Sequence, residues 1–106
     1  MNKSKLRPRQ PEPLLPLNDS ELGLDDLFLA SARQDLISIE QALERRDYHA
    51  MQNTVHSLKG AAMIFRMTAT VNATQQIEAV LSQGSVIDHA ILSAACRALR
   101  RQIELS

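Results

Sequence analysis

The spacing of apolar residues after about residue 25 constrains this chain more than any other feature of its sequence. Apolar side chains recur there at alternating intervals of three and four, which places them on one side of a helix. Two such sets follow one another: Leu29, Ala32, Leu36, Ile39 and Leu43, then Met51, Val55, Leu58, Ala62 and Phe65. The pattern predicts one helix that begins near Asp25 and a second over residues 48–66, each packed in a bundle through one face.

Two further helices are predicted in the remaining sequence. The third, over residues 68–83, is rich in Thr and Val, so its intrinsic helix propensity is low and it depends on packing. The fourth runs to the end of the chain. The apolar residues expected to face the core are Ala73, Ile77, Val80 and Leu81 in the third helix and Ile91, Leu92, Ala95, Leu99 and Ile103 in the fourth.

Residues that start and stop helices lie between these segments. Asp47 is expected to cap the second helix and to leave a tight antiparallel turn before it. Gly84 is expected to end the third helix. Ser85, followed by Asp88 three residues later, resembles a capping box for the last helix, with Asp in place of the usual Glu. Short loops of this kind join antiparallel neighbours in a bundle.

Composition excludes the other common fold classes. Aromatic residues make up 3% of the chain and there are three glycines, which is too few for the alternating strands and turns of a β-sandwich or barrel. The sequence has no Gly-rich phosphate loop of a nucleotide-binding domain. The predicted fold is therefore all-α, an antiparallel four-helix bundle with up-down-up-down topology. Arg33, Glu40 and Glu44 are expected on the outer face of the first helix.

The first eighteen residues differ from the rest. Residues 1–18 contain all four prolines and carry four basic residues against one acidic residue, whereas residues 19–106 carry eight basic and eleven acidic residues. Proline favours an extended, solvated path, so we expect a linker over 1–18 and the bundle over 19–106. A mildly acidic body argues against nucleic-acid binding. With one cysteine and no long apolar run, a cytoplasmic location is expected.

A candidate site lies on the second helix. At 100° per residue, His56 points about 140° away from the centre of the apolar stripe. Gln52, Lys59, Gly60 and Met63 lie within about 60° of it on the same surface. Glycine in an exposed helix interior costs about 0.5–1 kcal/mol relative to alanine. That cost is explained if another surface must approach the helix backbone closely.

The other two histidines and the cysteine are interpreted as solvated, capping or core residues. A lone surface histidine is usually solvated, and His49 and His89 are expected to be surface or capping residues. Cys96 is expected to be a small core residue. These histidines and the cysteine lie on different helices without the spacing of metal ligands, so no metal site is predicted.

The residues around His56 do resemble a known family. The run 56–62, His-Ser-Leu-Lys-Gly-Ala-Ala, is similar to the H-x-L-K-G-x-A signature of histidine-containing phosphotransfer (HPt) domains. Residues 28–47 are similar to the helix and turn that precede that signature. Ile77 and Glu78 stand where the family commonly has an apolar residue followed by Glu or Gln. The resemblance covers the chain from about Leu24 to its C-terminus.

The resemblance implies a function for each residue of the candidate site. His56 would take a phosphoryl group from an aspartyl phosphate on a receiver domain and pass it to a response regulator. Lys59 would offset the phosphoryl charge, and Gly60 would let the receiver pack closely enough for in-line attack. Glu78 would accept a hydrogen bond from the other ring nitrogen and fix the tautomer. The docking surface would comprise Gln52, Lys59, Gly60 and Met63.

The resemblance also implies a context. The sequence has no ATP-binding kinase core, so it resembles the C-terminal module of a hybrid sensor kinase, at the cytoplasmic end of an inner-membrane protein, although a free-standing shuttle stays open. No cofactor is expected on this domain, since the receiver would hold the Mg²⁺, and a monomer is expected. The family usually has a second glycine where this chain has Arg66, so the resemblance does not determine how the second helix ends and packs.

Two alternatives remain open from the sequence alone. The first is a non-catalytic helical adaptor that binds a partner through the Gln52–Met63 face without carrying phosphate. The second is a homodimer formed through an exposed apolar stripe.

Overall fold

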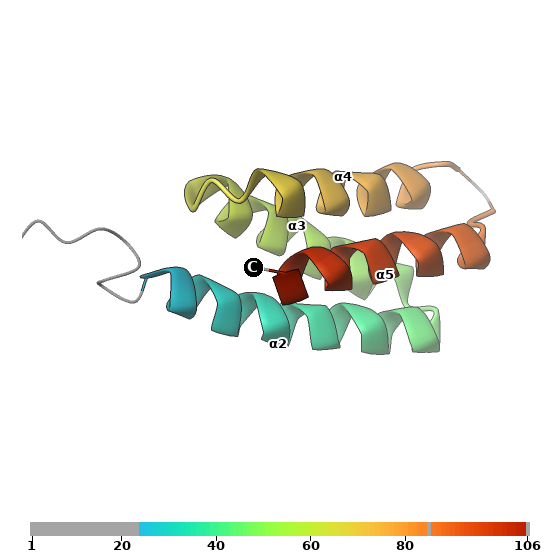
Figure 1. The fold of residues 1–106 in the computed structure, drawn as a ribbon. Coiled ribbons are helices and arrows are strands. Elements are labelled where there is room, and N and C mark those ends of the chain that lie inside the picture. The colour runs from blue at the N-terminus through green and yellow to red at the C-terminus, as the bar shows by residue number, and fades with distance from the viewer. Residues whose placement is uncertain (1–23, 85, 106) are drawn as a thin grey trace, which may run out of the picture.

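The computed structural model describes residues 24–84 and 86–105, which form an antiparallel bundle (Figure 1). Each helix packs against the next one along the chain, and the last packs back against the first. The chain thus runs up, down, up and down, and no strand occurs in the described residues. The predicted all-α fold is confirmed. The helices are α2 (Leu24–Arg45), α3 (Tyr48–Ile64), α4 (Thr68–Leu81) and α5 (His89–Leu105).

The core is formed by the faces that the apolar spacing predicted. Burial of these side chains supplies most of the stability of such a bundle. The rings of Phe28 and Phe65 lie 5.3 Å apart between centroids and pack together where α2 begins and α3 ends. The core residues are Phe28, Leu29, Ala32, Leu36, Ile39, Ala42, Met51, Val55, Leu58, Ala62, Ala73, Ile77, Val80, Leu92, Cys96, Leu99 and Ile103.

The turn from α2 to α3 closes the end of α2 with two backbone hydrogen bonds. Arg46 has a positive φ of 56°, and the amides of Arg46 and Asp47 donate to the carbonyls of Leu43 and Ala42. This is the Schellman pattern. Asp47 then caps α3, because its side chain accepts a hydrogen bond of 3.1 Å from the amide of Ala50. The predicted cap is confirmed.

The turn from α3 to α4 repeats the same geometry. Arg66 has a φ of 59°, and the amides of Arg66 and Met67 donate to the carbonyls of Met63 and Ala62. A left-handed φ is the conformation that glycine adopts without steric cost. Arg66 therefore forms the turn that a glycine would form at this position. The predicted helix end at residue 66 is wrong, because α3 ends at Ile64.

The last helix begins later than the capping box predicted. Ser85 lies outside the described residues, and the Asp88 side chain accepts a hydrogen bond of 3.1 Å from the amide of Ile91. Asp88 therefore caps α5 itself, and its predicted place inside the first turn is wrong. Ile91 is 52% exposed instead of buried, because the face that starts at Leu92 meets the core.

The ends of α4 also differ in detail from the prediction. The helix ends at Leu81, two residues before the predicted end. Gly84 follows with a φ of 99°, as expected of a glycine beyond a helix end. Thr74, one of two buried threonines of α4, donates its hydroxyl hydrogen to the Val71 carbonyl at 2.6 Å. A buried hydroxyl that is satisfied within its own helix costs little.

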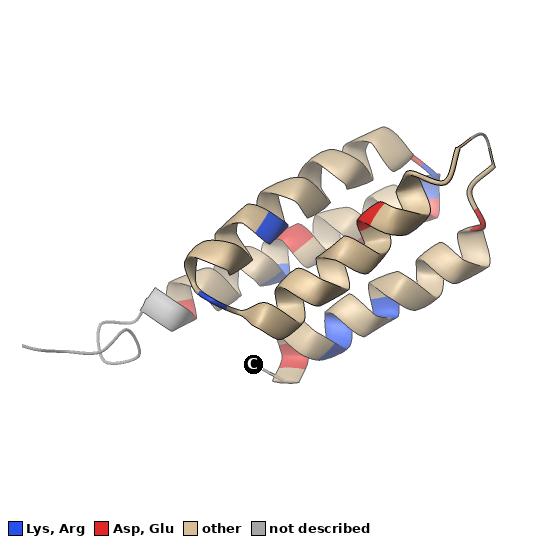
Figure 2. Cartoon of the chain, turned by 90° about the horizontal axis from the view of Figure 1, so that it is seen from above, with Lys and Arg blue, Asp and Glu red and all other residues tan. Residues whose placement is uncertain are grey.

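Charged residues are interspersed along the bundle (Figure 2). Arg33 and Glu44 are exposed, as predicted. Glu40 is half-buried, which corrects its predicted outer position, because Arg100 reaches across from α5 and donates to it at 2.7 Å. The predicted linker over 1–18 lies outside the described residues. None of the four helices is both long enough and apolar enough to cross a membrane.

Candidate functional site

His56 projects from the middle of α3 into solvent. Its side chain is 76% exposed, whereas its neighbours on the opposite side of the helix, Val55 and Leu58, are fully buried. The predicted exposure of the imidazole is confirmed. Because α3 is fixed by its core residues, the histidine is presented on a rigid element rather than on a loop.

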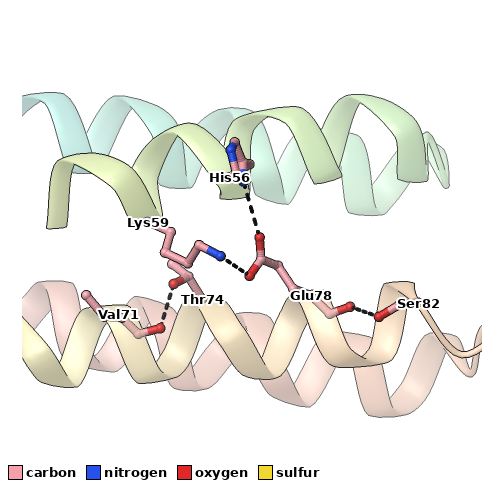
Figure 3. Close-up of polar contacts among 6 residues, drawn as sticks. All are labelled: His56, Lys59, Val71, Thr74, Glu78 and Ser82. Atoms are coloured by element: carbon pink, nitrogen blue, oxygen red, sulfur yellow. Dashed lines mark hydrogen bonds and ion pairs between the residues drawn. The ribbon is translucent and has the colours of Figure 1, made fainter. Parts of the chain in front are cut away.

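Two charged side chains lie beside the imidazole, one from each of two helices (Figure 3). Lys59, one turn along α3, donates to Glu78 Oε1 of α4 at 2.8 Å. The other carboxylate oxygen, Oε2, lies 3.7 Å from His56 Nδ1. That separation is an ion-pair contact and is longer than a hydrogen bond. Glu78 thus links the lysine and the histidine, and the packing of α4 on α3 creates the group.

The core holds Lys59 and Glu78 in place. Lys59 follows the buried Leu58, and Glu78 follows the buried Ile77. Their side chains are only 22% and 24% exposed, so their aliphatic stems lie along the seam between α3 and α4. Ser82 donates to the Glu78 carbonyl at 2.6 Å and closes the end of α4 just beyond the site. The pair is therefore positioned before any partner arrives.

The charges of this group are balanced at rest. Lys59 is matched by Glu78, so no net positive charge faces the ring. Glu78 lies on the Nδ1 side of His56, and within the part of the chain that the structure describes no hydrogen bond involves Nε2. A neutral imidazole with its proton on Nδ1 has its lone pair on Nε2. The outward nitrogen is then the nucleophilic one.

The surface around His56 is open. Gln52, Gly60 and Met63 are all exposed on α3, as the helical count predicted. A Cβ added at Gly60 would have no atom within 4 Å. Packing within the described residues therefore does not require glycine at this position.

The other histidines and the cysteine lie apart from this group. His49 is exposed, and His89 is half-buried with its Nδ1 3.2 Å from the Tyr48 hydroxyl. Cys96 is buried, and desolvation raises the pKa of its thiol to about 11. Across residues 24–84 and 86–105, no three His, Cys, Asp or Glu side chains gather as a metal site would require.

Sequence reasoning missed two features of this region. The direct contact between Lys59 and Glu78 depends on how far α4 is shifted along α3, which no spacing within one helix reveals. The exposed Ile64, next to Met63, was also not predicted. Its signal was present in the sequence, because residue 64 lies opposite the apolar stripe of α3 by the 100° count.

Comparison with known proteins identifies the family. The family model described as Hpt domain matches residues 24–105, which is well over half of the chain. Searches of curated proteins and of solved structures gave no match. Hpt domains take part in histidine phosphotransfer in phosphorelays, where they interact with receiver domains. Because the family model matches most of the chain, and because the four-helix fold and the exposed histidine agree with it, the chain belongs to the Hpt domain family.

Proposed function

We propose that this chain is the histidine phosphotransfer module of a two-component phosphorelay, with His56 as the residue that carries the phosphoryl group. The observation that carries the proposal is the group on α3 and α4: an exposed imidazole whose Nδ1 faces Glu78, with Lys59 bound to the same carboxylate. Such a group can orient a nucleophile and stabilise an anion beside it.

The transfer begins when an aspartyl phosphate of a receiver domain approaches the outward face of the ring. Nε2 of His56 attacks phosphorus, an N–P bond forms, and the P–O bond to the aspartyl carboxylate breaks. The carboxylate leaves as an anion, and the imidazole keeps its proton on Nδ1. Glu78, whose Oε2 lies 3.7 Å from Nδ1 at rest, moves closer to accept a hydrogen bond from that N–H, and its negative charge offsets the positive charge that the ring gains. The reverse sequence passes the phosphoryl group to the next receiver.

Lys59 and Gly60 act on either side of the transferred group. Phosphoryl transfer depends on positioning and on stabilising the charge of the equatorial oxygens. Lys59 turns from Glu78 towards those oxygens once they arrive, since its stem already lies beside His56. Gly60 lets the receiver backbone approach α3 along with Gln52 and Met63, so that attack is in line.

The partner supplies what this domain does not. The acidic pocket of the receiver would hold the Mg²⁺ that would neutralise charge on the phosphoryl group, so no cofactor is proposed on this chain. The domain acts as a cytoplasmic monomer that exchanges phosphate with receivers of a hybrid sensor kinase and of response regulators. Since it has no ATP-binding core, its phosphate comes from another domain.

Transfer from a receiver tests the proposal. Receivers of the same organism are phosphorylated and mixed with the chain or with its His56→Gln variant. The proposal predicts an acid-labile, base-stable label on the chain and none on the variant. Equal labelling of both proteins would overturn it. Binding of a receiver that survives His56→Gln, with no transfer to the unaltered chain, would instead favour the non-catalytic adaptor that docks through the Gln52–Met63 face.

A further inference from the structure

The end of α3 carries an exposed apolar surface beyond the phosphotransfer group. Met63 is 59% exposed and Ile64 is 78% exposed, which is unusual for large apolar side chains one after the other on a helix. A shallow hollow adjoins them and is lined by Met63, Arg66, Thr68 and Val71. These five residues, from the end of α3 to the first turn of α4, are named the α3–α4 turn surface.

Arg66 supplies the only charge on this surface. Its backbone has a left-handed φ of 59°, which disfavours any side chain relative to glycine. Its guanidinium forms no ion pair with any residue that the structure describes, whereas Lys59 is already paired with Glu78. An arginine thus occupies a position that suits glycine, where it pairs with no acidic side chain among the described residues. Its charge is available to a partner.

The α3–α4 turn surface lies close enough to His56 to be covered by a receiver that binds there. At 1.5 Å per residue, Met63 and Ile64 lie about 10 and 12 Å further along the helix axis than His56. A specific interface buries about 800 Å² on each side, which corresponds to a patch of roughly 16 Å radius. A receiver centred on His56 therefore covers the α3–α4 turn surface as well.

We infer that the α3–α4 turn surface selects the receiver domain that exchanges phosphate with this chain. The inference rests on the proposed function. The surface fits a receiver that presents an apolar side chain to the hollow and a carboxylate to Arg66. The apolar contact supplies affinity, and the charge pair at the rim favours receivers with an acidic residue there and disfavours receivers with a basic one.

The test uses the receiver that transfers phosphate fastest to the unaltered chain among those of the same organism. Transfer is measured for Arg66→Gly, for Arg66→Glu and for the control Arg97→Glu, which reverses an exposed charge on α5. The inference predicts that kcat/KM falls about fivefold in Arg66→Gly and at least twentyfold in Arg66→Glu, mainly through KM. It also predicts that Arg97→Glu stays within twofold and that added salt weakens transfer less in Arg66→Gly than in the unaltered chain.

A second donor separates this inference from the proposed function. Phosphoramidate is a small phosphoryl donor that reaches His56 without touching the turn, so both Arg66 variants should be labelled by it at the unaltered rate. Receiver transfer that is the same in Arg66→Glu and Arg97→Glu would overturn the inference. No label on His56 from either donor would overturn the proposed function and the inference with it. A dimer in sedimentation that Arg66→Glu dissociates would assign the surface to a second copy of the chain and also overturn it.

Discussion

Replacing Gly60 with alanine should change stability and phosphotransfer in opposite directions. The added Cβ meets no atom within 4 Å, so the substitution introduces no clash within the domain. Alanine is more favourable than glycine in a helix interior by about 0.5–1 kcal/mol. For a domain of this size, that gain raises Tm by about 2–8 °C. Thermal unfolding followed by circular dichroism measures the shift.

The same methyl group should hinder the partner. It stands about 1.5 Å above the helix backbone, on the side where the receiver must approach for in-line attack, and small misplacements of reacting groups cost up to about a hundredfold in rate. We expect the rate of transfer from a phosphorylated receiver to fall at least tenfold in Gly60→Ala, while labelling by phosphoramidate is unchanged.

Gly84→Ala is the matched control. Gly84 has a φ of 99° and open space around it, so alanine there is strained and should lower the stability by about 1 kcal/mol, with no effect on transfer. A Gly60→Ala variant that is less stable than the unaltered domain, or that transfers phosphate at the normal rate, would refute the argument that this glycine serves a partner.

Three further predictions follow from individual contacts. Glu78→Gln removes the carboxylate that lies 3.7 Å from His56 Nδ1 and offsets the positive charge of the phosphorylated ring, so the equilibrium between phosphohistidine and receiver phosphate should move about three- to tenfold towards receiver phosphate, which corresponds to roughly 1 kcal/mol. No shift, measured by quantifying both labelled species, would contradict this electrostatic role of Glu78. Burial raises the pKa of the Cys96 thiol to about 11, so a thiol reagent at pH 8 should react slowly with the folded domain and rapidly in denaturant. Fast labelling of the folded domain would contradict the burial of Cys96. Because the pKa of this thiol is raised on folding, its contribution to stability is complete below about pH 9 and is lost as the pH rises towards 11. Asp47→Ala removes the hydrogen bond to the amide of Ala50 and should lower the free energy of unfolding by about 0.5–2 kcal/mol in urea titration, whereas a change in phosphotransfer at equal folded fraction would show that the cap does more than stabilise α3.

The fold was predictable because the apolar period is regular over most of the chain. Spacings of three and four determine which side of each helix is buried, and burial of that side decides the packing. The start of α5 was not predictable in the same way. Ser85 and Asp88 have the spacing of a capping box, but Asp88 can also cap a helix by itself, and the residue that does so depends on where the preceding loop lets the helix begin.

The site was predictable to the extent that it lies on one helix. The angle between His56 and the apolar stripe is fixed by helix geometry, so the exposure of the imidazole followed from the sequence. The contact of Glu78 with Lys59 joins two helices, and its geometry depends on tertiary packing. The left-handed backbone of Arg66 was also hidden, because arginine, unlike glycine, gives no sequence signal for that conformation.

Mass spectrometry can identify the residue that carries the phosphoryl group. The chain has three histidines, and cleavage after Arg46 and Lys59 releases residues 47–59, a peptide that contains both His49 and His56. After transfer from a receiver at neutral pH, fragmentation of this peptide by mass spectrometry assigns the phosphoryl group to one of them. We expect phosphate on His56 alone. Phosphate on His49 or His89, or on a carboxylate, would contradict it.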